Sequence, residues 1–169
     1  MFQSGHEVLL IARGAHLEAI QRDGLRFITP NRDCRLEIPV VGHPRDADIG
    51  VGDIIVLCVK SQHTDDALHT LYDVAGDDVP IVCAQNGVSN EFAALRRFRR
   101  VYGMVVYLPA EHLQPGEVIN SAEESAGMLD VGCYPSGIDI TVEELATALT
   151  ASGFSSLPDP AIMLSLIHI

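Results

Sequence analysis

Three polar side chains that suit an anionic ligand lie at or near the ends of short apolar runs. Arg13 and Lys60 come directly after such runs, and Asn86 lies in the turn Gln85-Asn86-Gly87 that follows a third run. Guanidinium and ammonium groups bind phosphate or carboxylate, and an amide side chain both donates and accepts hydrogen bonds. Ligands of open α/β sheets bind at the carboxyl ends of strands, so these positions are candidates for a binding site.

The type of residue at position 13 predicts which dinucleotide would bind. In dinucleotide-binding folds the end of the second strand meets the adenosine ribose, where an acidic residue suits NAD and a nearby arginine suits the 2′-phosphate of NADP. Arg13 therefore points to NADP, and Lys60, the only lysine in the chain, is placed to meet a phosphate or carboxylate. Ordinary alternatives stay open: a solvated loop arginine, a strand-end lysine that reaches solvent, and a common Asn-Gly turn.

Other candidate groups favour a structural role. His63 and His69 are six residues apart and fall on different helix faces, so no metal pair is expected. The arginines on either side of Phe98 are expected at a solvated helix end. The segment Gly50-Val51-Gly52 precedes its strand and lacks the third glycine of a phosphate-binding loop.

The elements that would position these side chains alternate between strand and helix. Apolar runs at residues 8–12, 54–59, 81–84 and 101–108 predict strands buried on both faces. Helical spacing of apolar residues lies between them, at 16–22, 65–75 and 90–98. This alternation predicts βαβ units in a doubly wound parallel sheet.

The remaining segments predict a hairpin-like excursion and a late helix. Residues 25–41 contain two short extended stretches, and 117–120 and 127–134 are again extended. Thr141 followed by Glu144 has the spacing of a capping box, so a helix is expected from Thr141 to a stop at Gly153.

Composition limits the possible partners. The 169 residues are 47 % hydrophobic, enough for a packed core, and the net charge of −12 argues against nucleic acid and anionic membranes. The four cysteines form no C-x-x-C pair and are expected to be reduced core residues. No secretion signal or membrane-spanning run is present, which predicts a cytoplasmic protein.

Several motifs, taken in order, resemble those of the ketopantoate reductase family. They are GHEVLLIARG at 5–14, LCVKS at 57–61, QNGV at 85–88, VVY at 105–107 and Pro115-Gly116, and the similarity runs over residues 5–160. Members of this family reduce a 2-oxo acid, typically 2-dehydropantoate to pantoate, with NADPH on the route to pantothenate and coenzyme A. The resemblance implies that Arg13 holds the 2′-phosphate, that Lys60 and Asn86 line the cofactor and substrate cleft, and that the backbone near Ala110 touches the cofactor.

The chain also departs from the family pattern at both ends. A glycine fingerprint should lie about 20 residues before the ribose-reading position, so the first strand and its Gly-rich loop are expected to be absent, with Gly5 as the C-cap of the first helix. The catalytic lysine and the substrate glutamate belong to a helical domain of the family that is absent here, and no catalytic residue is assigned in this chain. Residues 1–163 are thus expected to be a partial NADP-binding Rossmann domain.

The last six residues, 164–169, are not expected to belong to the natural protein. They match the translation of CTGTCTCTTATACACATC, which resembles a transposon end used in sequencing libraries, and are expected to be a non-native tail. The polypeptide made alone is expected to be insoluble or molten, while the full-length parent is a possible homodimer. Two alternatives stay open: a non-catalytic NADP-binding or sensing module, and a family reductase that acts on another 2-oxo acid.

Overall fold

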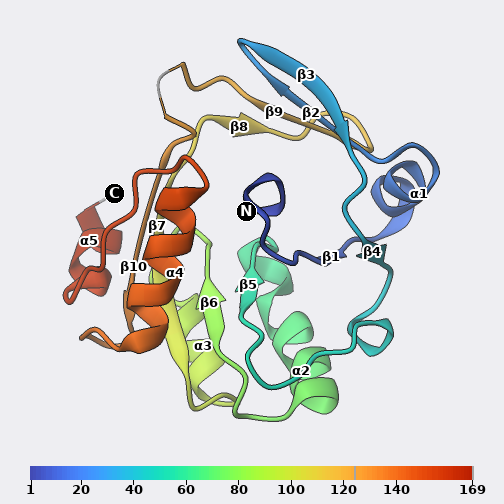
Figure 1. The fold of residues 1–169 in the computed structure, drawn as a ribbon. Coiled ribbons are helices and arrows are strands. Elements are labelled where there is room, and N and C mark those ends of the chain that lie inside the picture. The colour runs from blue at the N-terminus through green and yellow to red at the C-terminus, as the bar shows by residue number, and fades with distance from the viewer. Residues whose placement is uncertain (124, 169) are drawn as a thin grey trace.

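A four-stranded sheet with the order β10-β7-β6-β5 forms the centre of the computed structural model, which describes residues 1–123 and 125–168 (Figure 1). Its strands are β5 (Ile55–Leu57), β6 (Ile81–Cys83), β7 (Val101–Tyr107) and β10 (Met128–Cys133). β5, β6 and β7 run parallel, and β10 is antiparallel to β7. The prediction of a parallel α/β sheet is confirmed for these three strands.

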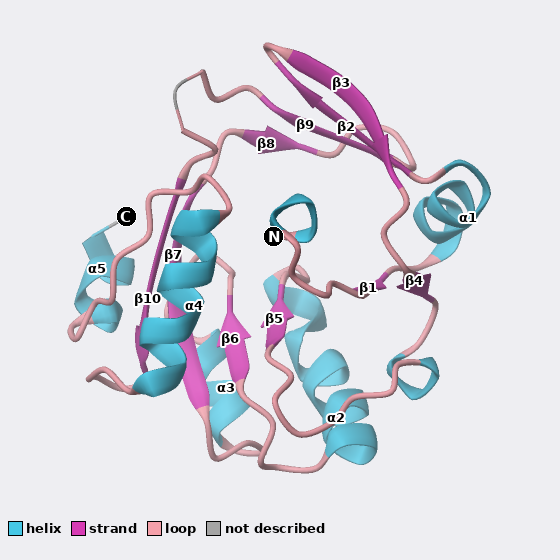
Figure 2. Ribbon diagram, viewed as in Figure 1, coloured by secondary structure: helices cyan, strands magenta, loops and turns pink. Residues whose placement is uncertain are grey.

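Helices cover both faces of this sheet (Figure 2). The helices α2 (Thr64–Ala75) and α3 (Asn90–Leu95) pack on one face, and α4 (Ile140–Ala151) packs on the other. Successive side chains of a strand point to opposite faces, so Ile81 and Cys83 join the first core cluster and Val82 joins the second. This two-sided burial is the reason that β6 is apolar throughout.

A second sheet has the order β3-β2-β9-β8. It contains β2 (Leu25–Thr29), β3 (Arg32–Leu36), β8 (Ala110–Glu111) and β9 (Glu117–Asn120). β2 and β3 are the antiparallel hairpin expected in this region. The parallel pairing of β2 with β9 joins residues 91 positions apart and was not predicted.

The N-terminal segment forms a small sheet of its own. A 3₁₀ turn, η1 (Phe2–Ser4), ends at Gly5, whose positive φ of 86° confirms the predicted C-cap. β1 (Leu10–Ile11) pairs in parallel with β4 (Val40–Val41), and α1 (Gly14–Asp23) lies between the two strands in the chain. Within the described residues, β1 pairs only with β4 and β5 pairs only with β6.

Two helix boundaries differ from the predicted ones, and one helix was not predicted. α4 begins at Ile140, because Asp139 is its N-cap and accepts a hydrogen bond from Val142 N, so the capping box assigned to Thr141 was wrong. α3 ends at Leu95, three residues before the predicted end. α5 (Ile162–His168) includes five of the last six residues, and its Leu166 is buried against Val105.

The remaining elements are short, and the cysteines are less buried than expected. The 3₁₀ turns η2 (Pro44–Asp46) and η3 (Ser61–His63) flank β5 along the chain. All four cysteines are free, but only Cys83 is a core residue; Cys58 is exposed, and Cys34 and Cys133 are half-buried. Across the described residues, no helix has the length and hydropathy needed to cross a membrane.

Candidate nucleotide-binding site

The carboxyl ends of β5, β6 and β7 meet at one edge of the central sheet. Lys60 follows β5, Asn86 follows β6, and Ala110 follows β7, while the parallel registers Leu57↔Cys83 and Cys83↔Gly103 align the strand ends. All three residues are exposed. The topology thus brings Lys60 and Asn86 to the loops of one sheet edge, where ligands of parallel α/β sheets bind, while Ala110 lies beyond the end of β7, in β8 of the second sheet.

The backbone around Lys60 is fixed although its ammonium group is exposed. Lys60 is the N-cap of η3, and its carbonyl accepts a hydrogen bond from His63 N at 2.8 Å. The preceding carbonyl, that of Val59, accepts a hydrogen bond from the Gln85 side chain. A single cation whose backbone is fixed by hydrogen bonds is well suited to bind an anionic group.

In the turn after β6, one amide side chain is buried and the other is exposed. Gln85 is 6 % exposed, whereas Asn86 is exposed and Gly87 has a φ of +98°, as the Asn-Gly turn predicts. Gln85, considered from sequence as part of a ligand-facing amide turn, therefore points into the protein, and Asn86 alone faces outward.

Arg13 lies in the other parallel pair. It follows β1, is exposed, and forms the N-cap of α1 with extended backbone angles. The structure does not place it in the central sheet, because β1 pairs with β4. Arg13 lies at a strand's carboxyl end, just before a helix, and its contact with a ribose phosphate stays a prediction.

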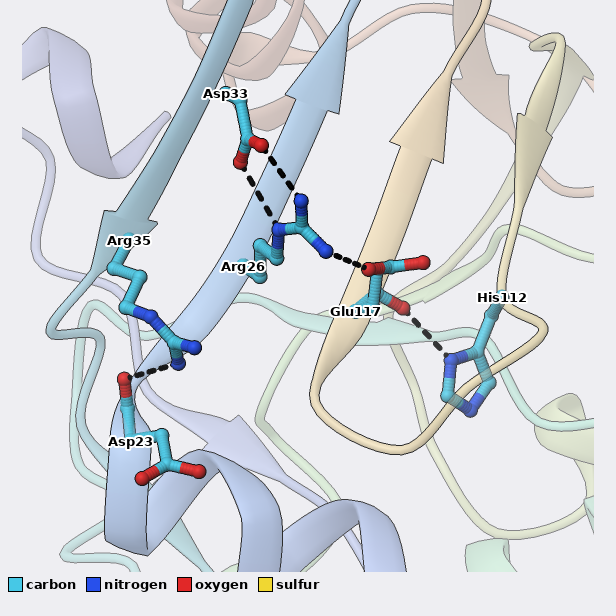
Figure 3. Close-up of polar contacts among 6 residues, drawn as sticks. All are labelled: Asp23, Arg26, Asp33, Arg35, His112 and Glu117. Atoms are coloured by element: carbon cyan, nitrogen blue, oxygen red, sulfur yellow. Dashed lines mark hydrogen bonds and ion pairs between the residues drawn. The ribbon is translucent and has the colours of Figure 1, made fainter.

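The sheet that carries Ala110 is joined through charged side chains (Figure 3). The guanidinium of Arg26 donates to both carboxylate oxygens of Asp33, at 3.1 and 2.7 Å, and to Glu117 at 2.8 Å. The hydrogen bond from Arg26 lowers the pKa of the Asp33 carboxyl. These contacts hold β9 against the hairpin, and β9 in turn pairs with β8.

A histidine pair connects the loop after Ala110 to α1. Gly116 N donates to Nδ1 of His16 at 2.9 Å, and the ring centroids of His16 and His112 are 4.2 Å apart. Burial, and to a smaller extent the neighbouring His112, lowers the pKa of His16. His16 is therefore favoured in its neutral form, in which Nδ1 accepts the Gly116 proton.

Sequence reasoning missed a set of buried polar residues below the site. Thr64, Asn90 and Glu91 are 3 %, 2 % and 0 % exposed and lie at the starts of α2 and α3. Burial raises the pKa of the Glu91 carboxyl. Their position two or three residues beyond the motifs at 57–61 and 85–88 was the available signal, but polar residues at helix starts are also ordinary caps.

Neither the hollows along α4 nor the potential metal ligands of the described residues involve the predicted cofactor residues. Two hollows, of about 450 and 560 Å³, lie along α4 and are lined by none of the four predicted cofactor residues. Among residues 1–123 and 125–168, no group of three or more His, Cys, Asp or Glu side chains could hold a metal ion.

The fold and the residues at the edge of its central sheet define a class of domain. A parallel sheet covered on both faces, with polar residues in the loops after successive strands, is the arrangement of a Rossmann-like nucleotide-binding domain. A family profile described as "Ketopantoate reductase PanE/ApbA" matches residues 1–136. The chain therefore belongs to the ketopantoate reductase family.

Individual proteins agree with this assignment. A 2-dehydropantoate 2-reductase of Pyrococcus horikoshii is 30 % identical over 157 residues, which are 90 % of this chain and 48 % of that protein. The crystal structure of a PanE/ApbA family ketopantoate reductase from Ralstonia eutropha JMP134 is 27 % identical, with a TM-score of 0.84 over 97 % of this chain and 52 % of that one.

A second enzyme shares the fold at lower identity. The ternary structure of D-mandelate dehydrogenase with NADH and anilino(oxo)acetate is 23 % identical, with a TM-score of 0.85 over 98 % of this chain and 53 % of that one. The chain thus spans about half the length of the relatives that it matches.

Proposed function

We propose that this chain is the nucleotide-binding part of an NADPH-dependent 2-oxo acid reductase whose substrate is 2-dehydropantoate. The observation that carries the proposal is the set of exposed polar residues after parallel strands, with Lys60 and Asn86 at one edge of the central sheet and Arg13 after β1. The exposed backbone of Ala110, beyond the end of β7, would add a further contact. Membership of the reductase family supports the same substrate class.

The residues present fit part of a dinucleotide. Arg13 would hold the 2′-phosphate, and Lys60 and Asn86 would contact the cofactor where it meets the substrate. Bound NADPH would supply the hydride for the keto carbon of the substrate. We assign no catalytic residue to this chain, and the group that protonates the carbonyl oxygen would belong to a helical substrate domain.

The proposed cofactor would need contacts that the residues named above do not supply. A glycine-rich loop for the pyrophosphate would precede β1, and its strand would fill the place between β1 and β5. Residues 1–163 would then be one part of a Rossmann domain, and residues 164–169 a non-native tail. A long read of the source DNA across both ends checks these boundaries.

Arg13→Ala tests the function and the cofactor together in the complete reading frame that encodes this chain. A charge-assisted contact contributes about 1.5–3 kcal/mol, so the KM for NADPH should rise about 10- to 100-fold while the KM for NADH stays within about twofold.

The control is Arg22→Ala, which removes an exposed arginine of α1 that pairs with Asp23. Equal effects of Arg13→Ala on both cofactors would contradict the proposed role of Arg13. NADPH binding without oxidation by 2-dehydropantoate or other 2-oxo acids would favour a non-catalytic binding module.

A further inference from the structure

Three buried polar side chains connect the two loops that carry Lys60 and Asn86. We call them the amide relay: Gln85, Thr64 and Asn90, which are 6 %, 3 % and 2 % exposed. Gln85 lies in the loop after β6, Thr64 is the first residue of α2, and Asn90 is the first residue of α3. Each therefore lies where a strand-end loop meets the protein interior.

The relay is continuous from one loop to the other. Gln85 Nε2 donates one hydrogen bond to the Val59 carbonyl and another to Thr64 Oγ1 at 2.8 Å. The Thr64 hydroxyl then donates to Asn90 Oδ1 at 3.0 Å. One amide group thus holds the backbone after β5 and the start of α2 at the same time.

This connection fixes Lys60 relative to Asn86. The carbonyl before Lys60 is held by Gln85, and the carbonyl of Lys60 itself is held by His63 N. Asn86 is the next residue after Gln85 and faces outward where Gln85 faces inward. The bond from Gln85 to Val59 therefore links the two backbone segments that carry these exposed side chains, beyond the last backbone bond between the strands, Ala84 N to the Leu57 carbonyl at 3.1 Å.

The relay is not explained by stability. Gln85 Oε1 and Asn90 Nδ2 are buried and have no hydrogen-bond partner within the part of the chain that the structure describes. A buried polar atom without a partner lowers stability, and an apolar side chain of the same size would avoid that loss. A polar network that leaves two atoms unpaired therefore indicates a role in positioning the two loops that it connects.

We propose that Gln85 is a positioning residue for cofactor binding: it holds the Val59–Lys60 peptide so that Lys60 and Asn86 meet the dinucleotide together. The inference rests on the proposed function, because it presumes that these two side chains contact the cofactor. Gln85 would then affect the affinity for the cofactor without contacting the cofactor itself.

Gln85→Met is the test, because methionine has a similar length and cannot donate a hydrogen bond. Contacts made equally before and during the reaction affect KM rather than kcat. In the complete reading frame we expect the KM for NADPH to rise about tenfold and kcat to fall less than threefold.

Thr64 supplies a matched pair of variants in case Gln85→Met folds poorly. Thr64→Val removes the hydroxyl at nearly constant volume and should raise the KM for NADPH about threefold, because Gln85 keeps its bond to Val59. Thr64→Ser retains the hydroxyl and should restore the wild-type KM.

Each outcome decides the inference. A lower melting temperature with an unchanged KM for NADPH in both Gln85→Met and Thr64→Val would show a purely structural role and overturn it, as would equal effects of Thr64→Val and Thr64→Ser on KM. A wild-type protein that does not oxidise NADPH with any 2-oxo acid would instead refute the proposed function, and this inference with it.

Discussion

Glu91 shows how a single buried carboxyl affects the core behind the site. It lies in the first turn of α3, is 0 % exposed, and neither carboxyl oxygen has a hydrogen-bond partner among the residues described. Burial, followed by the charge of Glu91, raises the pKa of the nearby Cys83 thiol to about 12. Burial also raises the pKa of Glu91 itself, so the neutral acid is favoured inside the protein.

Glu91→Gln should make the protein more stable at alkaline pH than wild type. From about pH 4.3 upward an unfolded glutamate loses its proton, whereas burial shifts this loss to higher pH in the folded protein. The wild-type free energy of unfolding therefore falls as pH rises from there through the folded pKa. Glutamine does not titrate. Each unit by which the pKa of Glu91 is raised therefore corresponds to about 1.4 kcal/mol of additional stability of the variant relative to wild type at alkaline pH.

Urea unfolding of the complete reading frame at pH 4.5, 6 and 8 measures this difference. Glu144→Gln, at an exposed position of α4, is the control and should change the pH dependence little. A difference between wild type and Glu91→Gln that is constant across the three pH values would refute the role assigned to the Glu91 proton.

Among the elements, α1 and the β8–β9 loop are joined by a glycine. Gly116 has a φ of +75°, and a Cβ at this position would lie 2.8 Å from the Cβ of Ala19 on α1. Its amide donates to His16, and its carbonyl accepts from Arg26 N at 2.8 Å. The joint therefore ties the helix that begins after Arg13 to the loop that follows Ala110.

Gly116→Ala should destabilise the protein by about 2–4 kcal/mol, the sum of about 1 kcal/mol for the left-handed conformation and about 1–3 kcal/mol for overpacking against Ala19. Gly5→Ala is the control, because Gly5 is left-handed, with φ 86° and ψ 8°, and has open space around its missing Cβ. Thermal melting of both variants compares them, and equal losses would show that the contact with Ala19 contributes nothing.

At the scale of the whole molecule, two strands have open edges. β1 and β5 each pair on one side only within residues 1–123 and 125–168, and apolar side chains near these edges are exposed: Leu9 at 42 %, Ile11 at 42 % and Val56 at 44 %. Unpaired apolar strand edges promote association with other chains. Each buried backbone group left unpaired costs about 1–3 kcal/mol, against a total stability of about 5–15 kcal/mol.

The chain of residues 1–169, produced alone, should therefore aggregate or unfold without a cooperative transition. Calorimetry and size-exclusion chromatography check this expectation. The full-length protein of the proposed function, with a further strand paired to β1 and β5, should instead melt cooperatively. A sharp transition of the 169-residue chain with monomeric elution would contradict the prediction.

The sequence by itself predicted the local elements and the exposed residues of the candidate site. Runs of apolar residues located β5, β6 and β7, and glycines located the turn at Gly87 and the cap at Gly5, because these depend on side-chain burial and backbone angles within a few residues. The exposed candidates Arg13, Lys60 and Asn86 followed from their places after strands.

The tertiary structure decided what depends on partners distant in the chain. The parallel pairing of β2 with β9 and the inward position of Gln85 were not read from the sequence. Local pattern does not encode which distant strand completes a sheet, or whether a polar side chain finds its hydrogen-bond partners inside the protein. Both outcomes are fixed by the packing of elements that only the folded chain brings together.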